Sequence, residues 1–148
     1  MISSNKIIFL ADDDVDDCTL FEDALREISS TTHLTTANDG IELMEILENR
    51  VPPKPDVIFL DLNMPRKNGF ECLEEIKQTS RFSNIPVVIF STSSQKETVN
   101  EVYKKGANYY ICKPGSFAKL KSAIQQILTV DFNENDGQPP REKFLLSL

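Results

Sequence analysis

Residues 7–17, IIFLADDDVDD, join five apolar residues to five aspartates within six positions. An unbroken apolar run of this length is typical of a parallel strand that is covered on both faces. Open parallel sheets bind their ligands at the carboxyl ends of the strands. Negative charge gathered where such a strand ends therefore predicts a site at one edge of a sheet.

Four more segments have the length of strands. Residues 57–60, 87–90 and 109–112 are continuous apolar runs, while residues 33–37, HLTTA, are more polar and predict an edge strand. Between these segments, apolar residues recur at spacings of three and four, which predicts five amphipathic helices. Alternating strands and helices imply right-handed crossovers. The sequence therefore predicts an α/β fold, a doubly wound five-stranded parallel sheet with five helices.

Composition limits the class of protein. The chain has 148 residues, of which 40% are hydrophobic, enough for one domain with a buried core. A net charge of −7 argues against nucleic acid and anionic lipid as partners. No apolar run approaches the ~20 residues that span a bilayer, and the first residues do not resemble a secretory signal. Cys18, Cys72 and Cys112 lack metal or redox spacing and suit a reducing compartment, so the sequence predicts a cytoplasmic protein.

The composition changes after Val130. Residues 131–143, DFNENDGQPPREK, are polar and rich in turn formers. We therefore expect one domain over residues 1–130 and a C-terminal tail over residues 131–148 that carries no effector domain. The final residues, KFLLSL, are apolar enough to dock on the domain or on a second subunit, and a frayed end is the alternative.

Polar residues follow several of the predicted strands: Asp12, Asp13, Asp61, Ser91 and Lys113. Two carboxylates ~4 Å apart repel by about 4 kcal/mol at an effective dielectric of 20, so the three aspartates need a cation among them. Oxygen ligands without clustered His or Cys favour Mg²⁺. The lysine ammonium and the serine hydroxyl suit phosphoryl oxygens. This set predicts phosphoryl transfer in which Asp61 attacks phosphorus.

Several motifs together resemble the receiver domain of two-component response regulators. They are Asp12-Asp13, VIFLDLNMPRKNGFECL around Asp61, IPVVIFST around Ser91, KKGANYY, and CKP at Lys113. The resemblance extends over residues 5–130 and implies a flavodoxin-like receiver fold with strand order 2-1-3-4-5. RVPPKPDVIFLDLNMPRKNG is similar to single-domain regulators of the chemotaxis and bacterial phytochrome groups.

The resemblance implies a role for each residue at the sheet edge. Asp61 would be the phosphoacceptor, and Lys113 would bind the phosphoryl group. Asp13, Asp61 and the backbone carbonyl of Asn63 would bind Mg²⁺ directly. Asp12 would act largely through metal-bound water.

The resemblance also implies a conformational switch. Ser91 would be the switch hydroxyl, and Tyr110 the fifth-strand aromatic that turns inward as Ser91 moves toward the phosphoryl group. The output surface would be the face formed by the fourth helix, the fifth strand and the fifth helix, where a homodimer could also form. The Lys113–Pro114 peptide is expected to be cis. Serine at 91 instead of the commoner threonine, and Gly115 after the proline, depart from the family pattern.

The implied partners are a histidine kinase or phosphotransfer protein as phosphoryl donor, and a downstream protein target. The sequence thus predicts a stand-alone response regulator, a signalling module rather than an enzyme. A Mg²⁺-dependent aspartyl-phosphate phosphohydrolase is an alternative, although such enzymes usually have an acid two residues after the nucleophile, where this chain has Asn63. A phosphorylation-independent interaction domain is a third possibility, but its degenerate relatives typically lose an acid or the lysine.

Other polar residues are given local structural roles. Asp14 is expected in a loop or as a helix N-cap, and Asp16 and Asp17 in a first helical turn, where the helix dipole favours anions. Gly69 is expected to supply positive φ in a turn. His33, the single histidine, is expected to be an ordinary strand residue.

Overall fold

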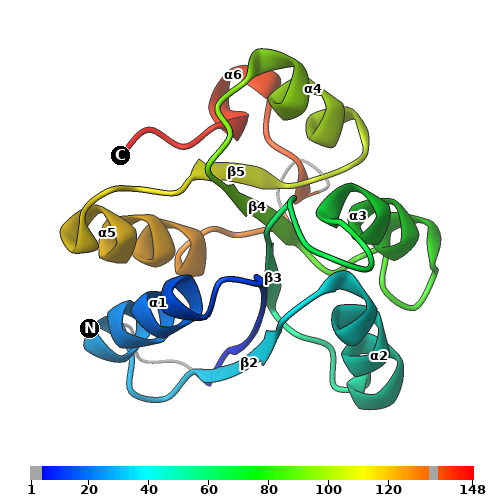
Figure 1. The fold of residues 1–148 in the computed structure, drawn as a ribbon, viewed down its shortest axis with the longest axis horizontal. Coiled ribbons are helices and arrows are strands. Elements are labelled where there is room, and N and C mark those ends of the chain that lie inside the picture. The colour runs from blue at the N-terminus through cyan, green and yellow to red at the C-terminus, as the bar shows by residue number, and fades with distance from the viewer. Residues whose placement is uncertain (1–4, 134–136) are drawn as a thin grey trace.

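A five-stranded parallel sheet forms the centre of the computed structural model, which describes residues 5–133 and 137–148 (Figure 1). The order is β2-β1-β3-β4-β5, so the predicted topology is confirmed and the polar strand β2 lies at an edge. The strands are β1 (Ile7–Ala11), β2 (His33–Ala37), β3 (Val57–Leu60), β4 (Val87–Ser91) and β5 (Tyr109–Cys112).

Helices cover both faces of the sheet, as predicted. Helices α1 and α5 pack side by side on one face, while α2, α3 and α4 cover the other (Figure 1). A sixth helix of four residues, α6, was not predicted. The helices are α1 (Val15–Ile28), α2 (Gly40–Arg50), α3 (Gly69–Gln78), α4 (Lys96–Lys104), α5 (Phe117–Leu128) and α6 (Arg141–Phe144). None of the helices in the described part of the chain combines the length and apolar character needed to cross a membrane.

The central strands are buried because both faces of the sheet are covered. All residues of β3 and β4 are buried, which explains why these strands appear in the sequence as unbroken apolar runs. On the α1 and α5 side, the Phe21 ring lies 4.9 Å from Phe59 and 5.8 Å from Phe90, both in edge-to-face geometry. This packing fixes α1 against the sheet, and with it the position of the acidic loop that precedes α1.

Helix caps set where the helices begin. Asp14 is the N-cap of α1, and its side chain accepts hydrogen bonds from the backbone amides of Asp16 and Asp17 at 2.9 and 3.1 Å. Asn68 caps α3 in a capping box with Glu71. The capping role considered for Asp14 is thus confirmed, and α1 begins directly at the carboxyl end of β1.

The expected positive φ at Gly69 is wrong. Gly69 is the first residue of α3, and the positive φ of this loop is at Arg66, with φ 66°. Glycine is required at 69 because a Cβ would overlap the carbonyl oxygen of Asp61 and lie 2.7 Å from Leu62 Cα. The residue thus allows α3 to pack directly on the backbone that carries Asp61.

The C-terminal residues return to the domain after α5 (Figure 1). Phe144 is completely buried, and its ring lies 4.9 Å from Tyr103 and 6.2 Å from Tyr110. The Leu146 amide donates a hydrogen bond of 2.9 Å to the Tyr110 carbonyl, at the outer edge of β5. Of the alternatives left open for KFLLSL, the structure therefore shows docking on the chain's own domain.

Replacing Gly69 with alanine is expected to lower the free energy of unfolding by about 2 kcal/mol, because the added methyl forces α3 away from the Asp61 backbone. Urea denaturation followed by circular dichroism measures the change. Gly115→Ala is the matched control, since a Cβ there meets nothing within 4 Å and should change stability by less than about 0.5 kcal/mol. Equal stability of the two variants would contradict the packing role of Gly69.

Candidate functional site

The site lies at the carboxyl ends of β1, β3, β4 and β5. The backbone amide of Asp61 donates to the Ala11 carbonyl at 2.9 Å, which keeps Asp61 next to the end of β1 and therefore close to Asp12. The amide of Lys113 donates to the Ser91 carbonyl at 2.8 Å in the same way. Main-chain bonds of the sheet thus bring together side chains that lie far apart in the sequence.

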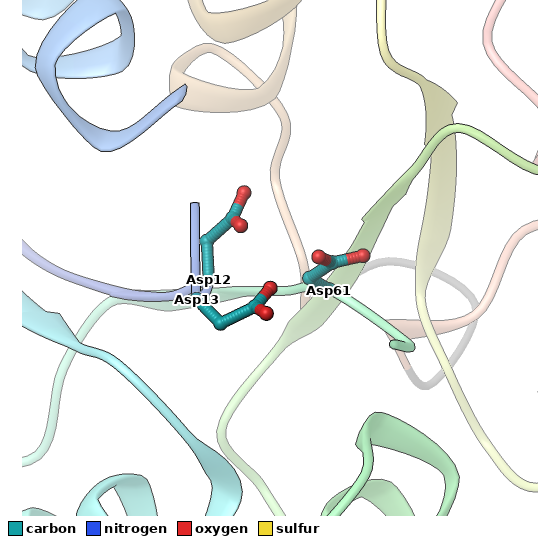
Figure 2. A group of neighbouring side chains, drawn as sticks. All are labelled: Asp12, Asp13 and Asp61. Atoms are coloured by element: carbon teal, nitrogen blue, oxygen red, sulfur yellow. The ribbon is translucent and has the colours of Figure 1, made fainter. Parts of the chain in front are cut away.

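Three aspartates form the centre of the site (Figure 2). Carboxylate oxygens of Asp12, Asp13 and Asp61 all lie within 4.8 Å of one another. Asp12 is 0% exposed and Asp61 6%, while Asp13 is open to solvent. Burial raises the pKa of Asp61 from 3.8 to about 6; Lys113 opposes this shift, and Asp12 adds to it. The three predicted aspartates do come together, and ionisation of Asp61 among them costs free energy.

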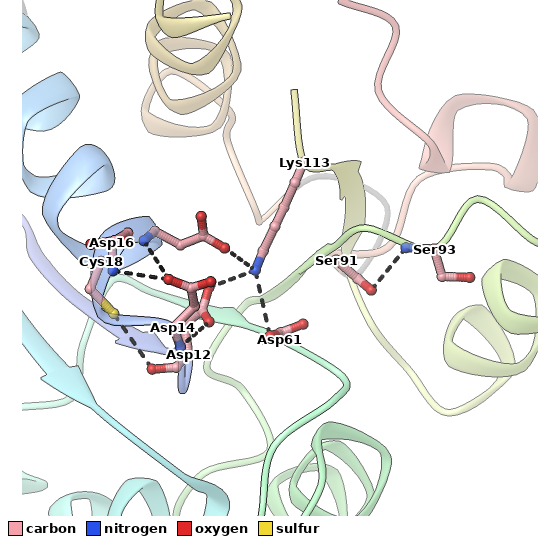
Figure 3. Close-up of polar contacts among 9 residues, drawn as sticks. Asp12, Asp14, Asp16, Cys18, Asp61, Ser91, Ser93 and Lys113 are labelled. Carbon is pink, nitrogen blue, oxygen red and sulfur yellow. Dashed lines mark hydrogen bonds and ion pairs between the residues drawn. The ribbon is translucent and has the colours of Figure 1, made fainter. Parts of the chain in front are cut away.

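The Lys113 ammonium lies among these carboxylates (Figure 3). Its Nζ is 2.8 Å from Asp12 Oδ2, 2.8 Å from Asp17 Oδ2 and 3.5 Å from Asp61 Oδ2. Burial by itself would lower the pKa of Lys113, but the contacts with Asp12 and Asp17 and the charge of Asp61 raise it above its usual range. One cation therefore faces four acidic groups when Asp13 is included, and the site keeps an excess of negative charge.

The donor set fits a hard divalent cation. Asp12 Oδ1 accepts from the Asp14 amide at 3.0 Å, but the buried Oδ2 has no partner in hydrogen-bond geometry, and its contact with Lys113 is an ion pair only. Asp13 presents an exposed carboxylate beside it. All-oxygen ligands with unused lone pairs suit Mg²⁺ or Mn²⁺, which retain several waters when bound to proteins. Near Asp61, the backbone amide of Asn63 acts to lower the carboxyl pKa.

Ser91 and Tyr110 are both buried and are linked through Ser93, whose contact with Ser91 is drawn in Figure 3. The Ser93 amide donates to Ser91 Oγ at 3.3 Å, and the Tyr110 hydroxyl donates to the Ser93 carbonyl at 2.7 Å. Burial raises the pKa of Tyr110. The predicted switch pair is therefore connected by one loop residue, which the sequence analysis did not single out.

Asp17 is a side chain at the site that the sequence analysis did not include among the site residues. Its first-turn position in α1 is as expected, but its carboxylate also binds Lys113 at 2.8 Å. The position within a first helical turn was visible in the sequence, whereas the direction of the side chain depends on how α1 packs on the sheet. The neighbouring Cys18 thiol has its pKa raised to about 11, by burial and then by Asp12 and Asp17, so it is not a nucleophile at neutral pH.

The expectation of a cis peptide at Lys113–Pro114 is wrong. The cis peptides in the described residues are Val51–Pro52 and Pro52–Pro53, so the bond at Lys113 is trans. Trans is the isomer that X-Pro bonds favour by about 0.5–1 kcal/mol. Lys113 reaches the acidic cluster with this ordinary backbone geometry.

Comparison with known proteins agrees with this geometry. A model of the response regulator receiver domain matches residues 8–125. The response regulator Rcp1 of Synechocystis sp. is 33% identical over 126 residues, which cover 82% of this chain and 86% of the relative.

Two solved structures have the same fold. The phosphorylated cyanobacterial phytochrome response regulator RcpA is 34% identical, with a TM-score of 0.77 over 84% of this chain and 91% of its own. The Mn²⁺-bound form of response regulator Rcp1 is 32% identical, with a TM-score of 0.75 over 91% of this chain and 99% of its own. The residues that the family model matches, 8–125, extend from β1 to β5 and include the strand ends that carry the site.

Asp61→Asn is expected to raise the free energy of unfolding at pH 7.5 by about 1–2 kcal/mol, because it removes a buried charge whose pKa is raised. Below pH 3.8 Asp61 is protonated in both the folded and the unfolded protein, so it does not lower the free energy of unfolding. As the pH rises from 3.8 to about 6, the unfolded protein ionises more readily than the folded one, so the cost in stability grows. The advantage of the variant should therefore increase between pH 4 and 7 and level off above. Urea denaturation at several pH values measures it.

Asp13→Asn is the control for this experiment, since it removes the same charge from an exposed position in the same cluster. Asp13→Asn should change the free energy of unfolding less than Asp61→Asn does, and this change should vary less with pH. A pH-independent difference between Asp61→Asn and the parent would contradict the assigned cause.

Proposed function

Because the chain belongs to the response regulator receiver family, we propose that it is a stand-alone response regulator in which phosphorylation of Asp61 switches a partner-binding surface. The observation that carries the proposal is the position of Lys113 Nζ, 2.8 Å from Asp12 and 3.5 Å from Asp61 at the edge of the sheet. A cation held beside a nucleophilic carboxylate and a second acid is what transfer of a phosphoryl group to Asp61 requires.

Mg²⁺ is the proposed cofactor. Asp13, Asp61 and the backbone carbonyl of Asn63 would hold it directly, and Asp12 would hold it largely through water. When bound, the cation neutralises charge on the carboxylates and on the phosphoryl oxygens. The buried Asp12 Oδ2, which has Lys113 as its ion-pair partner and no partner in hydrogen-bond geometry, and the exposed Asp13 carboxylate support this assignment. The Mn²⁺-bound structure of the similar protein Rcp1 supports it as well.

The residues of the chain then have separate tasks in the transfer. An oxygen of Asp61 attacks phosphorus while the bond from phosphorus to the donor breaks, and an acyl phosphate forms on Asp61. Lys113 moves from its carboxylate partners toward a phosphoryl oxygen, and the Ser91 hydroxyl donates to another. Later attack by water on phosphorus releases phosphate and restores the free carboxylate. The donor would be a histidine kinase or a phosphotransfer protein in the cytoplasm.

The signal would leave through the face formed by α4, β5 and α5. Movement of Ser91 toward the phosphoryl group would alter its contact with the Ser93 amide and, through Ser93, the hydrogen bond from Tyr110. Tyr110 lies in β5, so its displacement would change that face. Residues 1–130 would form the receiver domain. The output would then be binding of a downstream protein, or of a second copy of the chain, on this face.

Incubation with acetyl phosphate and Mg²⁺ should add about 80 Da, the mass of one phosphoryl group, to the parent and not to Asp61→Asn. Intact mass spectrometry detects the adduct. Chelation of the metal with EDTA should abolish it, because the acidic cluster then lacks its cation. An adduct on Asp61→Asn, or sustained hydrolysis of an unrelated phosphomonoester, would contradict the proposal, and the latter would favour a phosphohydrolase.

Asp17→Asn is expected to raise the affinity for beryllofluoride, a phosphoryl analogue, about fivefold in the presence of Mg²⁺. Asp17 competes with the phosphoryl oxygens for Lys113, and a partly exposed ion pair contributes up to about 1 kcal/mol. Asp16→Asn changes the net charge equally in the same helical turn but not the Lys113 contacts that the structure shows. Titration followed by heteronuclear NMR should therefore separate the two variants, and equal affinities would exclude a specific role for Asp17.

A further inference from the structure

The outer edge of β5 is covered by the chain's own C-terminal segment, residues 137–148. Strand β5 ends the sheet, so its outer peptide groups would otherwise face solvent and offer a template for another strand. Leu145 forms a parallel bridge with Tyr110, and the Leu146 amide donates to the Tyr110 carbonyl at 2.9 Å. The segment therefore begins to extend the sheet by strand addition.

Phe144 anchors the segment. Its ring is completely buried and makes edge-to-face contacts with Tyr103 of α4 and Tyr110 of β5. Burying an aromatic side chain of this size stabilises the docked state through the hydrophobic effect. Arg141 adds a hydrogen bond from Nε to Asn100 Oδ1 of α4 at 2.7 Å. The segment thus contacts both α4 and β5, two of the elements assigned to the output face.

The residues that precede Phe144 are held by hydrogen bonds to the end of α4 and the loop after it. Gln138 Nε2 donates to the carbonyls of Tyr103 and Ala107 at 2.7 and 2.8 Å. The Tyr103 hydroxyl donates to the Pro139 carbonyl at 2.8 Å. These bonds join the segment to the last turn of α4, where the Tyr103 carbonyl also accepts from the Gly106 amide at 3.1 Å, and to the residues that follow the helix. The path of the chain is therefore specific to this face.

The docked segment is nevertheless small enough to be released. It pairs with β5 through one bridge and one main-chain hydrogen bond in the described residues. Leu145 and Leu148 are 39% and 41% exposed. Elements with few buried contacts open with a small part of the global free energy of unfolding.

Tyr110 belongs to the switch and to the docking site at once. Its hydroxyl donates to the Ser93 carbonyl, and the Ser93 amide in turn bonds Ser91 Oγ. Its ring contacts Phe144, and its carbonyl accepts from Leu146. A displacement of Tyr110 therefore changes its contacts with the Ser91–Ser93 loop and with the C-terminal segment. The coupling between phosphorylation and docking of the segment must be reciprocal.

We propose that residues 137–148 are an intramolecular competitor for the output face. The partner they exclude is an extended apolar protein segment with an aromatic anchor, which would pair with the edge of β5 and fill the Phe144 site. A tethered segment acts at an effective concentration in the millimolar range, so a partner binds when the segment is released. Coupling of release to phosphorylation rests on the proposed function, whereas the competition itself does not.

The competition is tested with the full-length chain and a fluorescent peptide of residues 137–148. Phe144→Ala should free the face and bind the peptide at least tenfold more tightly than the parent, as measured by anisotropy up to millimolar protein. Leu146→Pro, which removes the amide bonded to Tyr110 without leaving a cavity under α4, should act in the same direction. Leu148→Ala, at an exposed position, should behave like the parent. The same peptide with Ala in place of Phe144 should bind none of the chains.

The competition would be overturned if the parent and both variants bound the peptide with equal affinity. It would also be overturned if neither variant bound the peptide while circular dichroism showed both to be folded. Hydrogen exchange of the Leu146 amide tests the coupling. Beryllofluoride with Mg²⁺ should change its exchange rate at least threefold. If beryllofluoride shifts the NMR signals of Asp61 while Leu146 exchange stays constant, the coupling fails and the proposed function stands. If beryllofluoride does not bind, the proposed function fails, and the peptide experiment still decides the competition.

Discussion

The structure depends on holding several carboxylates together at the edge of a sheet with a single ammonium group. Asp12 and Asp61 are almost wholly buried, so their charges cannot be screened by solvent, and Lys113 compensates only part of them. Such a cluster exists because main-chain bonds in β1, β3 and β5 fix its members more strongly than their repulsion separates them. The remaining negative charge would be the driving force for the proposed binding of a divalent cation and, with it, a phosphoryl group.

This constraint explains features of the packing that have no direct part in the chemistry. Gly69 lets α3 lie against the backbone of Asp61, and the Asp14 cap starts α1 immediately after the acidic loop. Both features limit the movement of the loops that carry the carboxylates. A site whose charges repel needs such support, because a loose loop would relieve the repulsion by turning a side chain outward. Rigidity at this edge is therefore a condition for the chemistry.

The strands and most of the site could be predicted from the sequence because each depends on short-range pattern. Buried parallel strands are continuous apolar runs, and the residues that follow them must meet at one edge. The features that the sequence did not predict depend on how helices and side chains are oriented in three dimensions. Asp17 reaches Lys113 only because α1 packs at one particular angle, and Gly69 is needed for close approach instead of for a turn. The cis peptide expected at Lys113 was carried over from the family and not from this chain's own residues.

The C-terminal segment was beyond sequence reasoning for a different reason. A polar stretch followed by FLLSL is compatible with a free end, with docking on the same chain or with docking on another copy, because local composition does not specify which surface is complementary. Complementarity comes from the aromatic rings of Tyr103 and Tyr110 and from the unpaired edge of β5. An edge strand that must stay available to partners is also exposed to unwanted pairing. Covering it with a short segment of the same chain would answer both needs, since the cover protects the edge at rest and can be displaced by a partner.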